Sequence, residues 1–268
     1  MELIKISEWF RDNRLSLHPK KTNVMVFRLK GGKNCADNVI NLTLNGIKLN
    51  QCGADFADKS VKFLGIMLDD NLDWSEHIRY VANKLRKIIY SLKQVKKIFP
   101  LGLRLQLFKS LFVPHAEYGI EIFGSSKCIN KLVKLHKWGI RTALNSKFNA
   151  HTEPLYKQYN ILKLINLYEV KCMTLIRAKI DNETPEKIQS MFLFHNEKNR
   201  KKYVVEQLFP TNKKVDSLPS FTIPRIWNKN RPQNLEKNKV CFKNKLKQTL
   251  LDKYTNNCNI RDCYICSA

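Results

Sequence analysis

Apolar residues recur at helical spacing from the start of the chain. Leu3, Ile6, Trp9 and Phe10 lie three or four positions apart, and polar residues fill the positions between them. This spacing places side chains on one face of an α-helix. The pattern predicts an amphipathic helix over residues 2–13.

Short runs of β-branched and aromatic residues follow this helix. The pattern predicts strands over residues 23–28 and 60–68, and a hairpin over residues 42–49 with its turn at Asn45-Gly46. One helix and several short strands together predict a small α+β unit.

The period becomes helical again after Asp69, with Ser75 as the predicted N-cap. Apolar stripes predict helices at 76–97 and 127–145, and a helix at 101–113 that stops or kinks at Pro114. Further helices are expected at 154–181, 184–194 and 237–253, with a proline-punctuated segment at 209–232 separating them.

The charge balance indicates a polyanionic partner. The 268 residues include 48 Lys and Arg against 23 Asp and Glu, a formal net charge of +25. A balance of this size favours nucleic acid; the alternative is a basic surface without a specific ligand. The predicted helices carry five cations outside the apolar stripes as candidate phosphate contacts: Lys84, Lys87, Lys131, Lys134 and Arg141.

No segment has the pattern of a membrane helix or a secretory signal. The most apolar stretch, 107–123, is interrupted by Lys, Pro, His and Glu, and the first ten residues alternate charge with bulk. We expect an intracellular protein, nuclear or cytoplasmic, that is neither secreted nor a membrane protein.

Three of the eight cysteines cluster near the end of the sequence. Cys258, Cys263 and Cys266 have C-x4-C-x2-C spacing, and the C-x2-C half suits two thiolates on one zinc ion. A closed zinc site needs a fourth ligand, which Cys241 or His195 would have to provide. The alternative interpretation is a tail with free thiols.

Several blocks resemble, in order, the reverse transcriptase of non-LTR (LINE-type) retrotransposons. Residues 6–22 and the following strand resemble the palm segment that comes directly after the catalytic strand in that family. The other blocks are the Leu-Gly hairpin within 62–78, the segments 114–119 and 152–156, and the ending at 263–266, which is similar to jockey-like elements.

The resemblance implies an organisation for the whole chain. Residues 1–74 would be the C-terminal remnant of an incomplete palm-like α/β unit, and residues 75–150 a helical thumb. Residues 151–268 would form a basic helical C-terminal region with a cysteine-containing tail. Lys20 and Lys21 lie in a loop that is near the incoming nucleotide in the family.

The family's catalytic carboxylates have no counterpart in these blocks. In the intact enzyme they hold two Mg²⁺ ions and belong to strands upstream of the Trp-Phe helix. We therefore assign no catalytic residue and expect no cofactor for this chain alone. Phe56-Ala57-Asp58 mimics the catalytic turn but is interpreted as a loop, and Asp69-Asp70 is interpreted as capping the following helix.

Other conspicuous side chains have structural interpretations. Trp9, Phe10, Trp74 and Trp138 occupy apolar positions and are expected in the core, although base stacking is the alternative. His77 and His115 are expected to be packed or capping histidines.

The sequence therefore predicts a reverse transcriptase fragment whose residual role is binding RNA, DNA or an RNA–DNA hybrid through phosphates. Two alternatives are a full enzyme, either completed in trans by upstream palm and fingers segments or cut off in a truncated gene model, and a fragment that a host adopted to bind nucleic acid.

Overall fold

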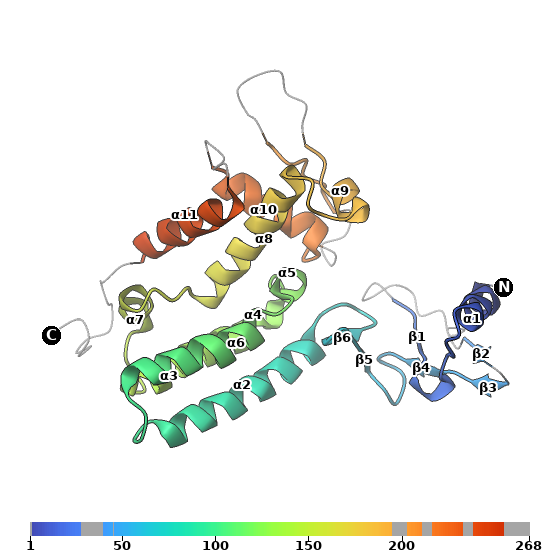
Figure 1. The fold of residues 1–268 in the computed structure, drawn as a ribbon, viewed down its shortest axis with the longest axis horizontal. Coiled ribbons are helices and arrows are strands. Elements are labelled where there is room, and N and C mark those ends of the chain that lie inside the picture. Colours follow the sequence, from blue (N-terminus) through green and yellow to red (C-terminus); the bar gives the residue numbers. More distant parts are fainter. Residues whose placement is uncertain are drawn as a thin grey trace. The chain divides into compact units, whose positions relative to one another are not determined.

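The chain forms two compact units in a computed structural model that describes residues 2–27, 40–44, 46–194, 203–210, 216–232 and 238–254. The units are Met1–His77 and Ile78–Ala268. The first combines a helix with short strands, and the second is built of helices (Figure 1). The predicted α+β class with a mainly helical character is confirmed. The palm, thumb and C-terminal limits stay predictions.

Each strand described in the first unit pairs with one other strand. Helix α1 (Glu2–Asp12) and the 3₁₀ turn η1 (Pro19–Lys21) precede strand β1 (Asn23–Met25), which pairs in parallel with β4 (Asn50–Cys52). Strands β2 (Thr43–Leu44) and β3 (Ile47–Lys48) form the hairpin expected at 42–49. Strand β4 has no counterpart in the sequence prediction, because Asn50-Gln-Cys52 lacks the β-branched pattern.

The single strand predicted over 60–68 is a hairpin. Strand β5 (Ser60–Phe63) pairs antiparallel with β6 (Ile66–Asp69), and Phe63 lies opposite Ile66. The two turn residues, Leu64 and Gly65, have φ values of 45° and 86°. Positive φ at both positions closes a tight hairpin with the correct twist. The periodicity missed this turn because both arms are apolar and only one glycine separates them, whereas the Leu-Gly hairpin implied by the resemblance is present.

Helix α2 (Ser75–Val95) leads into the helices of the second unit (Figure 1). They are α3 (Leu101–Leu107), α4 (Val113–Glu117), α5 (Ile120–Phe123), α6 (Asn130–Leu144), α7 (Thr152–Gln158), α8 (Leu164–Ile180), α9 (Glu186–Met191), α10 (Pro219–Asn230) and α11 (Lys239–Asp252), with a 3₁₀ turn η3 (Lys127–Ile129) before α6. Helix α8 is central, since it contacts α4, α5, α6, α10 and α11. None of the described helices is long and apolar enough to cross a membrane.

Pro114 does not end the helix that begins at Leu101. A π-helical turn, η2 (Phe108–Phe112), follows α3, and the helix then continues as α4 to Glu117. Pro114 comes directly after η2, so its missing N–H falls where the wider turn has already interrupted the regular i→i−4 pattern. The irregularity therefore precedes the proline.

Two other predicted segments differ from the structure. The segment expected to separate helices at 209–232 contains α10, which starts at Pro219 and buries Pro224 within it. The first proline is compatible with a helix start, but the second is a poor helix former that tertiary packing overrides. The stretch 154–181 divides into α7 and α8, because Asn160 adopts a left-handed conformation with φ of 51°.

The core next to α6 is aromatic and tight. Phe108 and Phe112 from η2 stack with their ring centroids 4.8 Å apart, and both are fully buried. His136 of α6 meets each ring edge-on at a centroid distance of 5.7 Å. Its Nδ1 lies 2.7 Å from the Tyr156 hydroxyl of α7. Gly139, one turn later, lets η2 approach α6 closely.

The tryptophan predictions were correct only in part. Trp74 is 4% exposed and belongs to the core, as expected, and Phe10 is half-buried. Trp9 is 59% exposed and Trp138 is 41% exposed. Their helical spacing was identified correctly, but periodicity does not show whether another element packs against an apolar helix face.

Candidate nucleic-acid interface

Helix α2 separates an apolar face from a cationic face. Its buried side chains follow a helical stripe: Ile78, Val81, Ala82, Leu85, Ile89 and Leu92. Lys84 and Lys87, predicted as phosphate contacts, are exposed on the remaining surface. Arg86 and Lys93 are exposed as well. The hydrophobic stripe fixes the helix in the core, so these cations are held on a rigid element.

Helix α6 repeats this arrangement and adds an aromatic ring. Lys131, Lys134 and Lys137 are exposed, and Trp138 is partly exposed at the same spacing. The opposite face buries Leu132, Leu135, His136, Gly139, Ile140 and Ala143. Positions three, four and seven residues apart share a helix face. Lys131, Lys134 and Trp138 therefore form one surface stripe, in which cations and an indole alternate.

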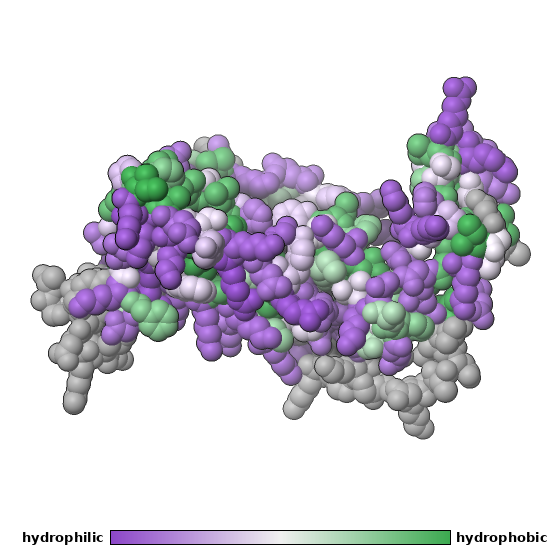
Figure 2. All heavy atoms as spheres, turned by 90° about the horizontal axis from the view of Figure 1, so that it is seen from below, coloured by the Kyte–Doolittle hydropathy of each residue, from purple (hydrophilic) through white to green (hydrophobic). Residues whose placement is uncertain are grey.

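The lysines of these two faces have no carboxylate partner among the described residues. Lys84 places its Nζ 4.6 Å from the ring centroid of Tyr80, a cation–π contact that leaves its charge in place. On the face that Figure 2 shows, hydrophilic side chains cover most of the surface, and hydrophobic patches lie between them. The charges of Lys84, Lys87, Lys131 and Lys134 are therefore available to an external anion.

Arg141 is held by contacts within the protein, unlike the exposed lysines. Its Nε donates a hydrogen bond of 2.8 Å to the Ala150 carbonyl, and burial lowers the pKa of the guanidinium. It lines a pocket of about 280 Å³ together with Lys137, His151 and Lys163. Lys163 forms an ion pair of 2.9 Å with Glu153. Replacing Arg141 would disturb both the loop after α6 and any anion binding.

Lys20 and Lys21 lie in the first unit. Both are exposed in η1, where the Lys21 N–H donates to the His18 carbonyl at 2.9 Å. Pro19 at the start of this turn fixes its backbone. These two lysines are therefore presented on an ordered turn.

The acidic pair Asp69-Asp70 holds turns together. One Asp69 carboxylate oxygen accepts the Asp73 N–H at 2.9 Å and the other accepts the Trp74 N–H at 3.0 Å. Asp70 accepts the Ala54 N–H at 3.1 Å. Burial raises the pKa of Asp69, and its two backbone donors partly oppose this effect. The prediction that this pair caps the following helix is wrong: Asp69 organises the turn before α2, and Asp70 holds the turn at Ala54.

The N-terminus of α2 is capped by a residue two positions before the predicted one. The Ser75 N–H donates to the Asp73 carboxylate at 2.9 Å, so Asp73 takes the capping role expected of Ser75. His77 is buried, and its Nδ1 accepts the Met67 N–H at 3.2 Å, as expected of a packed histidine. His115 is exposed, with its Nδ1 2.8 Å from the Leu111 carbonyl.

The described residues contain no group of three or more His, Cys, Asp or Glu side chains that could hold a metal ion. Asp58 lies in a loop, as predicted, and its carboxylate accepts a hydrogen bond of 2.8 Å from the Asn50 side-chain amide. Cys258, Cys263 and Cys266 lie outside the described residues, as does His195. Cys241 is exposed on α11.

Two polar features escaped the sequence prediction. The first is the buried hydrogen bond between His136 and Tyr156, which are twenty positions apart and belong to different helices. The second is a lysine-lined groove along α8 and α11. Its only sequence signal is the four-residue spacing of Lys239, Lys243 and Lys247, which resembles any solvated basic helix face.

Comparison with known proteins points to the class of RNA-directed DNA polymerases from transposons. Over 123 residues, 45% of this chain, the sequence is 26% identical to the probable RNA-directed DNA polymerase from transposon X-element of Drosophila melanogaster. The aligned part is 12% of that protein's length. No protein-family model and no solved structure matches. The similarity supports a relationship to transposon reverse transcriptases.

Proposed function

We propose that this chain is a nucleic-acid-binding part of a non-LTR retrotransposon reverse transcriptase, in which α2 and α6 hold a duplex through its phosphates. The observation that carries the proposal is the set of exposed lysines on two rigid helices without carboxylate partners among the described residues. The similarity to a transposon RNA-directed DNA polymerase supports the assignment.

The proposed place of the chain is the C-terminal part of such an enzyme, of a jockey-like type. The end of the palm, the thumb and the C-terminal region would correspond to residues 1–74, 75–150 and 151–268. An RNA–DNA hybrid is then the preferred partner. Contacts to phosphates position a protein on its duplex and carry little sequence information.

Metal-dependent phosphoryl transfer is assigned to other segments of the enzyme. The residues described here do not fit a pair of Mg²⁺ ions, since both oxygens of Asp69 accept backbone N–H groups and Asp70 also caps a turn. We therefore propose that this chain holds the template and primer and takes no part in the chemical step.

The expected strength of binding follows from counterion release. Each phosphate neutralised by a lysine lowers the slope of log K against log salt by about 0.9. The four lysines Lys84, Lys87, Lys131 and Lys134 would together contribute about −3.6 to the slope. A rise from 50 to 200 mM salt would then weaken binding about 150-fold through these contacts alone.

The test is fluorescence anisotropy with a labelled RNA–DNA hybrid at several salt concentrations. With Gln at Lys84, Lys87, Lys131 and Lys134, the variant is expected to lose most of the contribution of about −3.6 to the slope of log K against log salt. It should bind all sequences more weakly, by about the same factor. The matched control replaces four other exposed lysines by Gln, with the same change in net charge: Lys59, Lys187, Lys229 and Lys253.

The proposal requires the two variants to differ. Equal slopes in both would show that the affinity comes from net charge and not from α2 and α6. A wild-type chain with a native circular dichroism spectrum that does not bind the hybrid at low salt would refute the proposed function outright.

A further inference from the structure

A groove of about 700 Å³ runs between α8, α11 and the helix segment around Lys109 and Glu117. Its floor is aliphatic and is made by residues from several elements: Val113, Ile161, Leu162, Leu167, Val170 and Val240. Val240 is 63% exposed at the start of α11. The groove therefore offers apolar surface that the unit itself leaves in contact with solvent.

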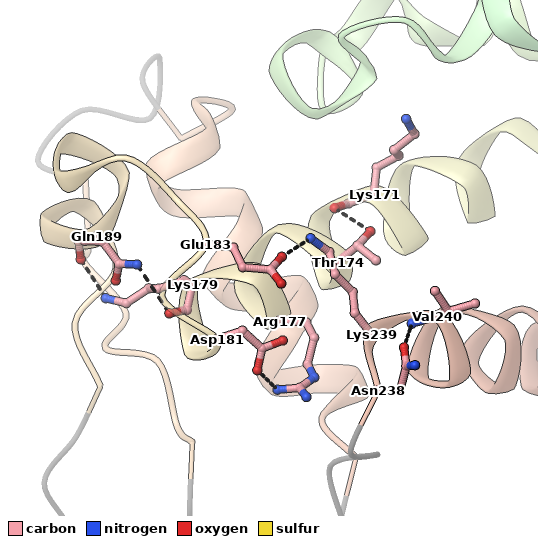
Figure 3. A network of polar contacts seen from close by, with 10 residues as sticks. All are labelled: Lys171, Thr174, Arg177, Lys179, Asp181, Glu183, Gln189, Asn238, Lys239 and Val240. Carbon is pink, nitrogen blue, oxygen red and sulfur yellow. Dashed lines mark hydrogen bonds and ion pairs between the residues drawn. The ribbon is translucent and has the colours of Figure 1, made fainter.

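Five lysines surround this floor, against one carboxylate in the lining, that of Glu117. They are Lys109, Lys171, Lys239, Lys243 and Lys247. Lys239 pairs with Glu183 at 2.5 Å, which ties the start of α11 to the residues after α8 (Figure 3). In the same view the Lys171 side chain extends away from that polar network. The rim of the groove is strongly cationic.

Three of these lysines follow the pitch of a helix. Lys239, Lys243 and Lys247 are four residues apart on α11, so successive side chains advance by about 6 Å along the axis. Carboxylates at every fourth position of a second α-helix have the same advance. A helix lying along α11 can therefore oppose Lys243 and Lys247 with one carboxylate each, beside the Lys239–Glu183 ion pair, and turn an apolar stripe toward the floor.

From this match we infer that the groove, lined by α8 and α11, is a docking site for an acidic amphipathic helix of a partner protein. Helix-in-groove recognition uses an apolar face flanked by complementary charge. Single-stranded nucleic acid is the less suitable occupant, because its recognition relies on aromatic platforms and the lining contains no aromatic residue. The inference is independent of the proposed function of α2 and α6.

The test uses the full chain and a labelled helical peptide of about 18 residues, long enough to be partly helical in water. The peptide carries Glu at every fourth position beside a Leu stripe, and a scrambled peptide of equal composition is the control. We expect the ordered peptide to bind at least tenfold more tightly than the scrambled one, because only the ordered peptide presents both faces.

Two variants of exposed residues separate the charge from the apolar contact. Lys243→Glu with Lys247→Glu is expected to weaken peptide binding at least tenfold, since two attractive pairs become repulsive. A peptide with Lys in place of Glu should recover binding to this variant. Val240→Ser should weaken binding severalfold without a change in charge. The four-lysine variant of α2 and α6 should bind the peptide as the wild type does.

Three results would overturn the inference. Equal affinity for the ordered and scrambled peptides would show attraction of any polyanion. Retained binding in the Lys243→Glu, Lys247→Glu variant, with a native circular dichroism spectrum, would place the peptide elsewhere. An unstructured RNA oligonucleotide that competes fully with the peptide, and is weakened by the charge reversal but not by Val240→Ser, would make the groove a nucleic-acid site.

Discussion

Gly139 gives a stringent test of the packing that supports the basic face of α6. It lies in the middle of the helix, and an added Cβ would be 2.9 Å from the Phe108 ring and 3.0 Å and 3.1 Å from two atoms of the Phe112 ring. Both rings are fully buried and stacked on each other, so neither can move aside without displacing its neighbour. Gly139→Ala should therefore destabilise the second unit.

The magnitude is the difference of two effects. Alanine is favoured over glycine within a helix by about 1 kcal/mol, whereas overpacking a tight core costs about 1–3 kcal/mol. Gly102, in the first turn of α3, is a control without overpacking, because nothing lies within 4 Å of its added Cβ. We expect Gly102→Ala to be neutral or stabilising by up to about 1 kcal/mol, and Gly139→Ala to be about 1–3 kcal/mol less stable than that control.

Chemical denaturation followed by circular dichroism at 222 nm measures the free energy of unfolding of both variants. In thermal scans the two should differ by about 3 to 9 °C. If Gly139→Ala is as stable as Gly102→Ala, the close approach of η2 to α6 is wrong. The exposed lysines of α6 would then lack the rigid support on which the binding proposal depends.

Three further predictions concern the buried histidine, the exposed indole and the acidic pair. Burial lowers the pKa of His136 from 6.5 to about 3, so the folded state binds its proton more weakly than the unfolded chain; stability should be full above pH 6.5 and fall by about 1.4 kcal/mol per pH unit below it. Denaturation at pH 7 and pH 5 should show this loss in the wild type, and His136→Gln should reduce it. An equal loss of the free energy of unfolding in both proteins would contradict the low pKa of His136. Trp138→Ala should lower affinity for a labelled single-stranded RNA in anisotropy assays by about fivefold or more, because an exposed indole can stack on an unpaired base; an unchanged affinity would show that Trp138 does not contact the bases. The purified chain should not extend a primer on an RNA template with Mg²⁺, and Asp69→Asn with Asp70→Asn should leave metal binding by calorimetry unchanged; template-dependent synthesis that survives repurification would refute this.

The amphipathic helices were the most predictable part of the fold. The stripe from Ile78 to Leu92 specifies both the helix α2 and its buried face, because a 3.6-residue period depends only on local sequence. The exposure of Lys84, Lys87, Lys131 and Lys134 follows from the same period. These positions could be assigned without knowledge of any neighbouring element.

Features that depend on contacts between distant residues could not be predicted. Arg141 lies on the exposed side by periodicity, yet it is held by the Ala150 carbonyl, which belongs to the loop after its own helix. Trp9 and Trp138 needed knowledge of which apolar faces meet a partner. The groove brings together lysines from three separate elements, and only one of them, α11, shows a pattern in the sequence.

The π-helical turn at Phe108–Phe112 controls the helical phase of the whole segment around it. From α3 to α4 the buried positions recur every four residues: Arg104, Phe108, Phe112 and Ala116. In an uninterrupted α-helix each such step overshoots a full turn by about 40°, so the row would soon rotate out of the core. The wider turn at η2 absorbs part of this drift. Deleting one residue there would replace the wide i→i+5 turn by a regular i→i+4 turn, and the side chains of α4 would keep nearly the same phase, because both turns cover about one full rotation. Relatives that lack one residue at η2 should therefore keep the same buried positions in α4, whereas a deletion within α3 or α4 would rotate the helical side chains that follow it by about 100°.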